Sequence, residues 1–244
     1  MKIRHLIPLS IRRRLVHTLL LRSTTPRVLS GPFRGMDYIS QSSGSSYYPK
    51  LLGTYEKELH ESIARIRKQQ PNLIVDIGAA EGYYAVGLAM LLPEASVLTF
   101  DIDGQAREHL RKLAERNGVT DRVQIDGRCS PEVLEAAIAG KPRVSIICDV
   151  EGYESELLDL ETVPSLRQAC ILVETHPHLS KGIEDLIHCR FSQSHKIERI
   201  ECLARGEADF DQARVGWYRL PDSLKRSLVI ERGPLTPWLY MTPR

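Results

Sequence analysis

The sequence predicts a single α/β domain with a mostly parallel sheet, and three observations lead to that prediction. Short apolar runs rich in β-branched residues alternate with longer segments of helical periodicity. Several of these runs end at an acidic residue, where open parallel sheets bind their ligands. At 244 residues, with 42% hydrophobic and 26% charged residues, the chain can bury one sizeable core.

The stretch from Leu73 to Val86 organises the chain. Its apolar run reaches Asp76, breaks at Gly78 and Gly82, and resumes with a helical pattern. This order predicts a strand, a tight turn and a helix N-terminus. The glycines let the backbone approach a ligand closely, and the helix start offers unpaired N–H groups. A ligand site is therefore predicted here, although a tight loop without a ligand would have the same pattern.

The glycine spacing decides which ligand this turn predicts. A nicotinamide or flavin site would need glycine at 78, 80 and 83, where the chain has Gly78, Ala80 and Tyr83. What remains is D-x-G-x-x-x-G, which resembles motif I of the class I S-adenosylmethionine-dependent methyltransferases. In that family the turn faces the amino-acid half of the cofactor. The resemblance implies that Asp76, Gly78 and Gly82 bind S-adenosylmethionine.

A helix is predicted before this strand, over residues 52–68, because apolar residues recur at i, i+4 and i+7 from Leu59. Tyr55 and Glu56 then fall in its first turn. The resemblance implies that this helix closes over the cofactor, which makes both residues candidates for cofactor binding. A surface tyrosine and a glutamate that compensates the helix dipole are the simpler interpretation.

The second predicted strand, residues 96–101, ends at Asp101. Its carboxylate has two oxygens for a vicinal diol, so Asp101 is the candidate ligand for a ribose. Asp103 is interpreted as the N-cap of the following helix. The third strand ends at Asp126, which in the methyltransferase pattern neighbours the adenine. A turn aspartate is an equally good interpretation of Asp126.

The fourth strand, residues 144–148, is followed by the motif D-x-E-G-x-E. Asp149 and Glu151 should point into the same crevice as the glycine turn, because ligands bind outside the carboxyl ends of parallel strands. This motif resembles that of the FkbM-type methyltransferases, whose next strand ends in E-x-H, matched here by Glu174 and His176. One position departs from the family, since Ala80 stands where motif I usually has asparagine.

The resemblance covers about residues 73–176 and implies the rest of the prediction. The fold would be a Rossmann-like class I methyltransferase, with a mostly parallel seven-stranded sheet, an antiparallel C-terminal strand and helices on both faces. The activity would be O-methyl transfer from S-adenosylmethionine to a hydroxyl of a sugar or glycoconjugate. Four catalytic candidates lie at the strand ends: Asp149, Glu151, Glu174 and His176.

Two roles are open for these catalytic candidates. His176 or Asp149 would act as the general base that removes the proton of an acceptor hydroxyl. Alternatively, Asp149 and Glu174 would hold a divalent cation that orients two acceptor oxygens. A helix N-terminus also favours a glutamate, which is a sufficient explanation of Glu151.

The charge distribution divides the chain. Residues 1–36 carry eight of the 33 basic residues and no acidic one, which leaves 25 basic against 31 acidic residues beyond them. Residues 1–27 predict a basic amphipathic helix, either on an anionic membrane surface or packed on the domain. We therefore expect an N-terminal unit over 1–50 with an irregular lid, a methyltransferase domain over 51–244, and a substrate-covering insertion over 204–235.

The remaining expectations concern location and partners. The five cysteines are odd in number and form no C-x-x-C, which predicts reduced thiols in the cytoplasm, with or without contact to the inner membrane face. The acidic main region disfavours nucleic acid, so a small-molecule or glycan acceptor is expected. A non-catalytic module that docks on a membrane through the basic N-terminus is the alternative function.

Overall fold

The computed structural model describes residues 26–43, 46–213, 220–231 and 236–244. The predicted basic helix lies almost entirely outside these residues. Within them, no helix is both long and apolar enough to cross a membrane. All five cysteines are free; three are buried, Cys202 is half-buried and Cys189 is exposed.

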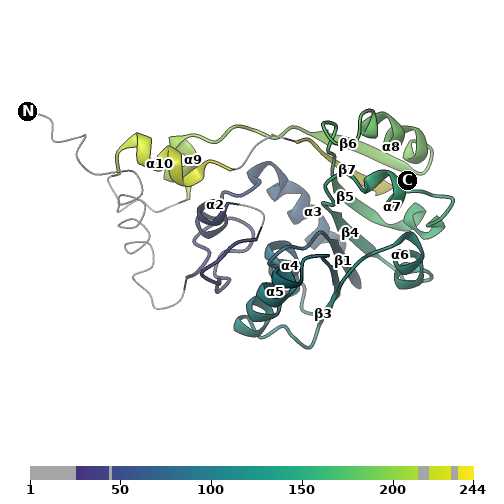
Figure 1. Ribbon diagram of the computed structural model, residues 1–244, viewed down its shortest axis with the longest axis horizontal. Coiled ribbons are helices and arrows are strands. Elements are labelled where there is room, and N and C mark those ends of the chain that lie inside the picture. Colours follow the sequence, from purple (N-terminus) through teal and green to yellow (C-terminus); the bar gives the residue numbers. More distant parts are fainter. Residues whose placement is uncertain (1–25, 44–45, 214–219, 232–235) are drawn as a thin grey trace, which may run out of the picture.

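One seven-stranded sheet runs through the molecule in the order β3-β2-β1-β4-β5-β7-β6 (Figure 1). Strands β1 to β5 are parallel, while β7 is antiparallel to both β5 and β6. The predicted fold class is confirmed, including the antiparallel closure at the C-terminus. The strands are β1 Leu73–Ile77, β2 Ser96–Phe100, β3 Val123–Asp126, β4 Val144–Cys148, β5 Cys170–Glu174, β6 His195–Ile200 and β7 Trp238–Pro243.

Helices cover both faces of this sheet (Figure 1). Side chains of β1 alternate between the faces, so Ile74 packs toward α4 while Val75 and Ile77 pack toward the opposite helices. One face carries α3 His60–Gln69, α4 Tyr83–Leu91 and α5 Gly104–Arg116. The other carries α6 Pro131–Ile138, α7 Glu154–Leu157 and α8 Ile183–Phe191, with the short 3₁₀ helix η2 Pro164–Gln168.

Side chains cap the starts of two helices, and the first of them, Asp103, was predicted. The Asp103 side chain accepts the N–H of Gln105 at 2.8 Å at the start of α5. Ser130 accepts the N–H of Val133 at 3.3 Å, directly before a proline in the first turn of α6. Both caps satisfy a backbone donor that the helix itself leaves unpaired. They fix where each helix begins after a strand end.

The helix predicted over 52–68 is wrong in its first half. The chain forms a short helix α2, Tyr47–Leu52, then a turn, the 3₁₀ helix η1, Lys57–Leu59, and α3. Gly53 ends α2 in the left-handed conformation at φ 73°. Glu56 also has a left-handed φ of 43°, which no α-helix accommodates. Tyr55 and Glu56 therefore lie in a turn and not in a helix.

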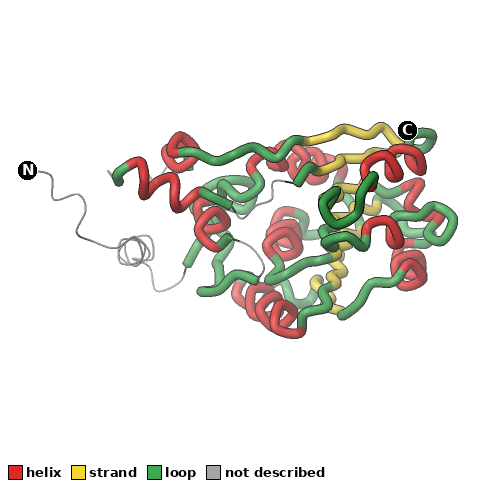
Figure 2. Tube along the Cα trace, turned by 45° about the horizontal axis from the view of Figure 1, so that its top comes forward, coloured by secondary structure: helices red, strands yellow, loops and turns green. Residues whose placement is uncertain are grey.

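A cap lies beside α2 and away from the strands (Figures 1 and 2). We use the name cap for residues 203–213 and 220–231, which contain α9 Glu207–Gln212 and α10 Asp222–Val229. Its apolar residues Phe210 and Leu228 form a separate small cluster with Leu52 of α2. The predicted covering role of residues 204–235 remains a prediction, and the position of the cap is compatible with it.

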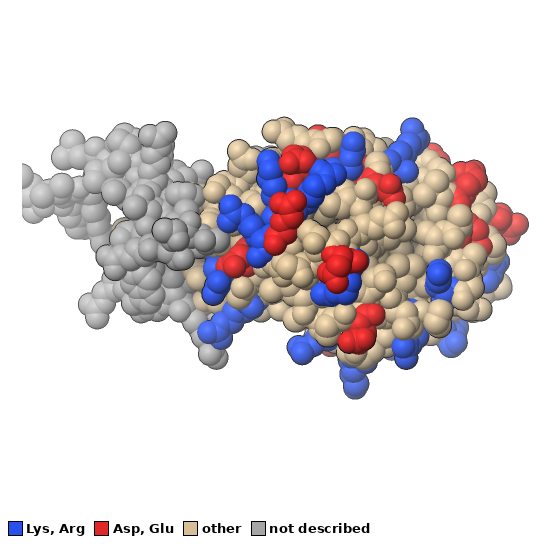
Figure 3. Space-filling view, turned by 90° about the horizontal axis from the view of Figure 1, so that it is seen from below, with Lys and Arg blue, Asp and Glu red and all other residues tan. Residues whose placement is uncertain are grey.

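Residues 26–43 pack on the domain. Phe33 meets the rings of Tyr83 and Tyr84 edge to face, at centroid distances of 5.0 and 5.9 Å. Its ring lies so close to α4 that a Cβ at Gly87 would come within 2.4 Å of it. This described part of the predicted lid therefore contributes to the core. On the outer surface, the face shown in Figure 3 carries interspersed basic and acidic side chains.

Candidate active site

A cavity of about 890 Å³ lies at the carboxyl ends of the parallel strands. Its position is the one that open α/β sheets use for ligands. All the predicted site residues line it except Gly82 and Asp126. The residues brought together are Tyr55, Glu56, Asp76, Gly78, Asp101, Asp149, Glu151, Glu174 and His176.

Gly78 joins two strand ends. It has φ 82°, and a Cβ there would stand 1.6 Å from the backbone oxygen of Asp149. Its N–H donates to the carbonyl of Phe100 at 2.9 Å, while the Asp149 N–H donates to the carbonyl of Ile77 at 2.8 Å. Only glycine permits this approach, because every other residue has a Cβ. Gly82 serves packing instead, since a Cβ there would meet Leu110 of α5 at 2.6 Å.

Asp101 anchors the turn between these glycines. Its Oδ2 accepts the N–H of Ala80 at 2.7 Å, and its Oδ1 accepts the N–H of Asp103 at 2.8 Å. Ala80 has a left-handed φ of 48°, a conformation that asparagine adopts more readily than alanine. The hydrogen bond to Asp101 thus holds the turn although position 80 is alanine and not the asparagine that is usual in motif I. Each carboxylate oxygen retains a second lone pair for a ligand.

Asp76 lies at the floor of the cavity. It is 3% exposed, on the face of β1 that looks toward α4. Burial raises the pKa of its carboxyl to about 7, although a hydrogen bond from the N–H of Ala85 lowers it in part. A cationic ligand group at this position would favour the ionised form. That property fits the predicted contact with a methionine ammonium.

A histidine and three carboxylates meet at the ends of β4 and β5. Nδ1 of His176 lies 2.6 Å from Oε1 of Glu154, which is fully buried. Nε2 lies 3.5 Å from Oδ1 of Asp149 and 3.8 Å from Oε2 of Glu174. Burial lowers the pKa of His176, but the bond to Glu154 and the charge of Asp149 outweigh it and raise that pKa.

Asp149 and Glu174 are close enough to share their ionisation. Burial raises the pKa of both carboxyls; the charge of Asp149 raises that of Glu174 further, while a hydrogen bond from Glu174 lowers that of Asp149 in part. Glu174 also accepts a hydrogen bond from the hydroxyl of Thr236. Ligand atoms of Asp149, Glu174 and His176 all lie within 4.8 Å of one another, which makes them a candidate cation site among the described residues.

Glu81 follows the glycine turn and forms a buried ion pair. Its Oε1 lies 2.7 Å from Nζ of Lys50, and both side chains are at most 4% exposed. The Tyr38 hydroxyl and the Ser42 hydroxyl donate to the same oxygen at 2.6 and 2.8 Å. Burial opposes ionisation, but Lys50 and these donors lower the pKa of Glu81 to about 2. Glu81 is therefore ionised and structurally satisfied.

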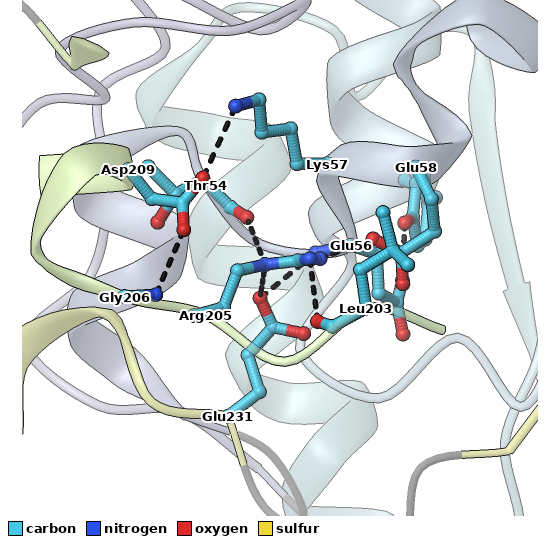
Figure 4. Close-up of polar contacts among 10 residues, drawn as sticks. Thr54, Glu56, Lys57, Glu58, Leu203, Arg205, Gly206, Asp209 and Glu231 are labelled. Carbon is cyan, nitrogen blue, oxygen red and sulfur yellow. Dashed lines mark hydrogen bonds and ion pairs between the residues drawn. The ribbon is translucent and has the colours of Figure 1, made fainter. Parts of the chain in front are cut away.

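Glu56 enters the cavity from the turn before η1. Its carboxylate accepts a hydrogen bond from the Tyr84 hydroxyl, and burial raises its pKa to about 8. Its N–H donates to Oε1 of Glu231 at 3.2 Å, and the same oxygen accepts Nε of Arg205 at 2.9 Å (Figure 4). Arg205 also donates to Glu58. The cap thereby holds Glu56 in its left-handed conformation.

Two predicted residues lie toward solvent. Glu151 is exposed at the cavity rim, with a left-handed φ of 45°. Asp126 is exposed at the end of β3 and accepts the side-chain amide of Gln124 at 2.8 Å. Gly127 and Arg128, which follow it, line the cavity instead. A role of the Asp126 carboxylate in adenine binding remains a prediction.

The sequence analysis missed several residues of the site. Ile102 lines the cavity although 83% of it is exposed, which offers an apolar surface beside Asp101. An apolar residue directly after the acidic strand end was a usable signal. Lys50, Glu231 and Trp238 also line the cavity, and no local pattern marked them, because each comes from an element distant in sequence.

Comparisons with known proteins found methyltransferases among the proteins similar to this chain. Bovine catechol O-methyltransferase is 28% identical over 95 residues, which is 38% of this chain and 32% of that protein. A candidate cobalt-precorrin-6B C(15)-methyltransferase of Pyrobaculum calidifontis is 32% identical over 74 residues, 30% of this chain and 38% of that protein. The matches thus span little more than a third of these curated relatives. No family model matches the chain.

Among solved structures, a candidate rRNA methylase from Clostridium thermocellum has a TM-score of 0.50. The two chains are 14% identical, and the likeness covers 76% of this chain and 95% of that one. At this identity the likeness shows the fold alone. Both curated relatives are methyltransferases by name, and each is matched over little more than a third of its length. The FkbM subfamily remains a prediction.

Proposed function

We propose that the chain is an S-adenosylmethionine-dependent methyltransferase that methylates a hydroxyl of a sugar-containing acceptor. One observation carries the proposal: a single cavity joins the Gly78 turn and Asp101 to the carboxylate-paired His176. S-adenosylmethionine would supply an electrophilic methyl group when bound. The chain would hold both partners in line and accept the proton of the attacking hydroxyl.

The residues present fit the cofactor. Asp101 has one free lone pair on each oxygen for the two ribose hydroxyls, and Ile102 presents an apolar surface to an adenine. Asp76 would face the cationic amino-acid half, where the positive charge would offset the burial that raises its pKa. Gly78 keeps the turn free of a side chain next to the bound group.

His176 is the proposed general base. Glu154 accepts the hydrogen on Nδ1, which orients the ring and leaves the lone pair of Nε2 for the acceptor hydroxyl. The charges of Glu154 and Asp149 would stabilise the imidazolium that forms. Asp149 is the alternative base, as it stands 3.5 Å from the same nitrogen. The sugar character of the acceptor is supported only by the FkbM-like motif.

A divalent cation is the second proposal for this centre. The three candidate ligands Asp149, Glu174 and His176 come from adjacent strand ends, and Glu154 would act behind the histidine as carboxylates do in metal sites. Turnover in EDTA against turnover in Mg²⁺ would test it. Equal rates in both would contradict a metal requirement.

Calorimetry with S-adenosylhomocysteine tests the function itself. We expect Asp101→Ala to weaken binding by about a hundredfold, because two hydroxyls lose a charged acceptor. Asp121→Ala is the matched control, since Asp121 is exposed and does not line the cavity. Unaltered affinity in Asp101→Ala would refute the ribose contact. No binding to the unsubstituted chain would refute the methyltransferase proposal, and binding without any turnover would favour a non-catalytic module.

A further inference from the structure

The cavity continues beyond the proposed base toward the cap. There it is lined by Glu56, Glu231 and Trp238, on the side away from Asp101 and Ile102. A volume of about 890 Å³ lies near the upper end of the usual range for ligand sites, so a second ligand has room beside a cofactor. What this part of the cavity would bind follows from its charges.

Two of its carboxylates lack a close basic partner. Glu56 forms no ion pair with any residue that the structure describes, and the nearest cation to Glu174 is His176 at 3.8 Å. The two basic groups nearby are engaged elsewhere. Lys50 pairs with Glu81, and Arg205 lies between Glu58 and Glu231 (Figure 4). Buried carboxylates without a cation are costly in free energy, and a cationic ligand would offset that cost.

Aromatic rings line the same part. Tyr55, Tyr84 and Trp238 border the cavity around the two carboxylates. The ammonium of Lys50 lies 4.8 Å from the centroid of the Tyr55 ring, so this ring already contacts one ammonium group. Rings that present their faces bind ammonium groups well, because the ring quadrupole is negative there.

Tyr83 provides an independent observation. It is 3% exposed, its ring lines the cavity, and its hydroxyl has no hydrogen-bond partner among the described residues. Burial, followed by the charges of Glu56 and Glu231, raises the pKa of this hydroxyl, so it stays protonated. A buried hydroxyl without a partner is uncommon, and an N–H donor from a ligand would satisfy its oxygen.

We propose that this part of the cavity recognises a positively charged amino group of the methyl acceptor, held by Glu56 and Glu174 among the aromatic rings. The acceptor would then carry both a hydroxyl and an ammonium group. This inference rests on the proposed function, because it assigns the acceptor side of the same cavity. A metal ion fits Glu56 poorly, since the candidate cation site comprises only Asp149, Glu174 and His176.

Arg205 contributes by holding Glu56 in place. Glu231, oriented by Arg205, accepts the N–H of Glu56 and so stabilises its left-handed backbone. Arg205 is 4% exposed and donates in addition to the carbonyl of Leu203 at 2.7 Å (Figure 4). Arg205 is thus a positioning residue, because its link to the cavity runs through Glu231.

The test uses benzylamine, which is protonated at pH 7.5, and its neutral analogue benzyl alcohol. Ligand-observed NMR titrations are run on the full chain with saturating S-adenosylhomocysteine and EDTA, so that only the acceptor side is free. We expect benzylamine to bind about tenfold more tightly than benzyl alcohol. Glu56→Gln should remove most of that preference, and Glu174→Gln serves as the second variant.

Glu161→Gln is the matched control, because Glu161 is exposed and does not line the cavity. It should keep the preference for benzylamine. Equal affinity for the two probes would overturn the inference, as would an unchanged preference in both cavity variants. In parallel samples without EDTA, displacement of benzylamine by Mg²⁺ in the unsubstituted chain and in Glu56→Gln alike would assign the carboxylates to a metal instead. S-adenosylhomocysteine binding in the same samples separates these outcomes from a failure of the proposed function.

Discussion

The molecule holds two groups of buried carboxylates that have opposite electrostatics. Behind the glycine turn, Glu81 has Lys50 and several donors as partners, and its pKa falls to about 2. In the cavity, Glu56 and Glu174 accept hydrogen bonds from hydroxyls, and burial raises their pKa values. Among the described residues neither forms an ion pair with Lys or Arg, and His176 lies 3.8 Å from Glu174. The difference separates a carboxylate that stabilises the fold from carboxylates that are poised for a ligand.

The largest expected effect comes from breaking the satisfied pair. Lys50→Met would leave the Glu81 carboxylate buried without its cation and should lower the free energy of unfolding by about 3–5 kcal/mol. Urea denaturation at pH 7 measures it. Lys57→Met is the control, because the Lys57 side chain is 39% exposed in its pair with Asp209 and should lose less than about 1 kcal/mol. Equal small losses would remove the contrast between the two groups.

Acid should weaken the same pair in a defined pH window. The pKa of Glu81 is about 2 in the folded chain and near 4.5 in the unfolded chain, so its stabilising contribution is complete above pH 4.5. That contribution, about 3 kcal/mol, should fade as the pH falls from 4.5 toward 2. Unfolding free energies of the unsubstituted chain and Glu81→Gln, measured from pH 7 to 3, should converge. A constant difference between them would contradict the lowered pKa.

The cavity group should respond in the opposite direction. Burial and the charge of Asp149 raise the pKa of Glu174, so the folded chain keeps this carboxyl protonated at a pH where the unfolded chain ionises it. Its contribution to stability is therefore lost as the pH rises above about 4.5. Glu174→Gln should therefore stabilise the chain at pH 7 by about 1 kcal/mol and leave it unchanged at pH 4. Thermal melts at both pH values test this. A loss of stability at pH 7 would mean that Glu174 is structurally satisfied.

The smallest effect is expected at the rim. Glu151 lines the cavity but is exposed, so water already solvates its carboxylate. Glu151→Gln should change the free energy of unfolding by less than about 0.5 kcal/mol in urea at pH 7. A gain in stability as large as that of Glu174→Gln would mean that the Glu151 carboxylate also lacks a partner.

Local patterns predicted the parts of the fold whose chemistry is local. The turn around Gly78 and the helix N-cap at Asp103 were each visible in a few neighbouring residues. The predicted end of the second strand, Asp101, lies one residue past the observed end at Phe100, and the cavity gathered most of the expected residues. Parallel topology explains why these residues meet, because it places the carboxyl ends of β1 to β5 along one edge of the sheet.

Contacts between distant segments could not be predicted in this way. Lys50 and Glu81 are 31 residues apart, and Arg205 and Glu58 are 147 apart. The turn at Glu56 was also missed, since apolar periodicity from Leu59 onward does not reveal a left-handed residue upstream. These three features decide which buried carboxylates lie beside a basic group. The ligand binding proposed for the cavity depends on that distinction.

The contact at Gly78 also bears on how such a site can change over evolution. The Gly78 turn lies against the carbonyl of Asp149, backbone against backbone. No side chain intervenes, so changes of nearby side chains leave the spacing of these two strand ends in place. The turn before η1 and the cap meet the far side of the cavity through side chains. Under the proposed function, a change of acceptor would therefore be accommodated at that far side.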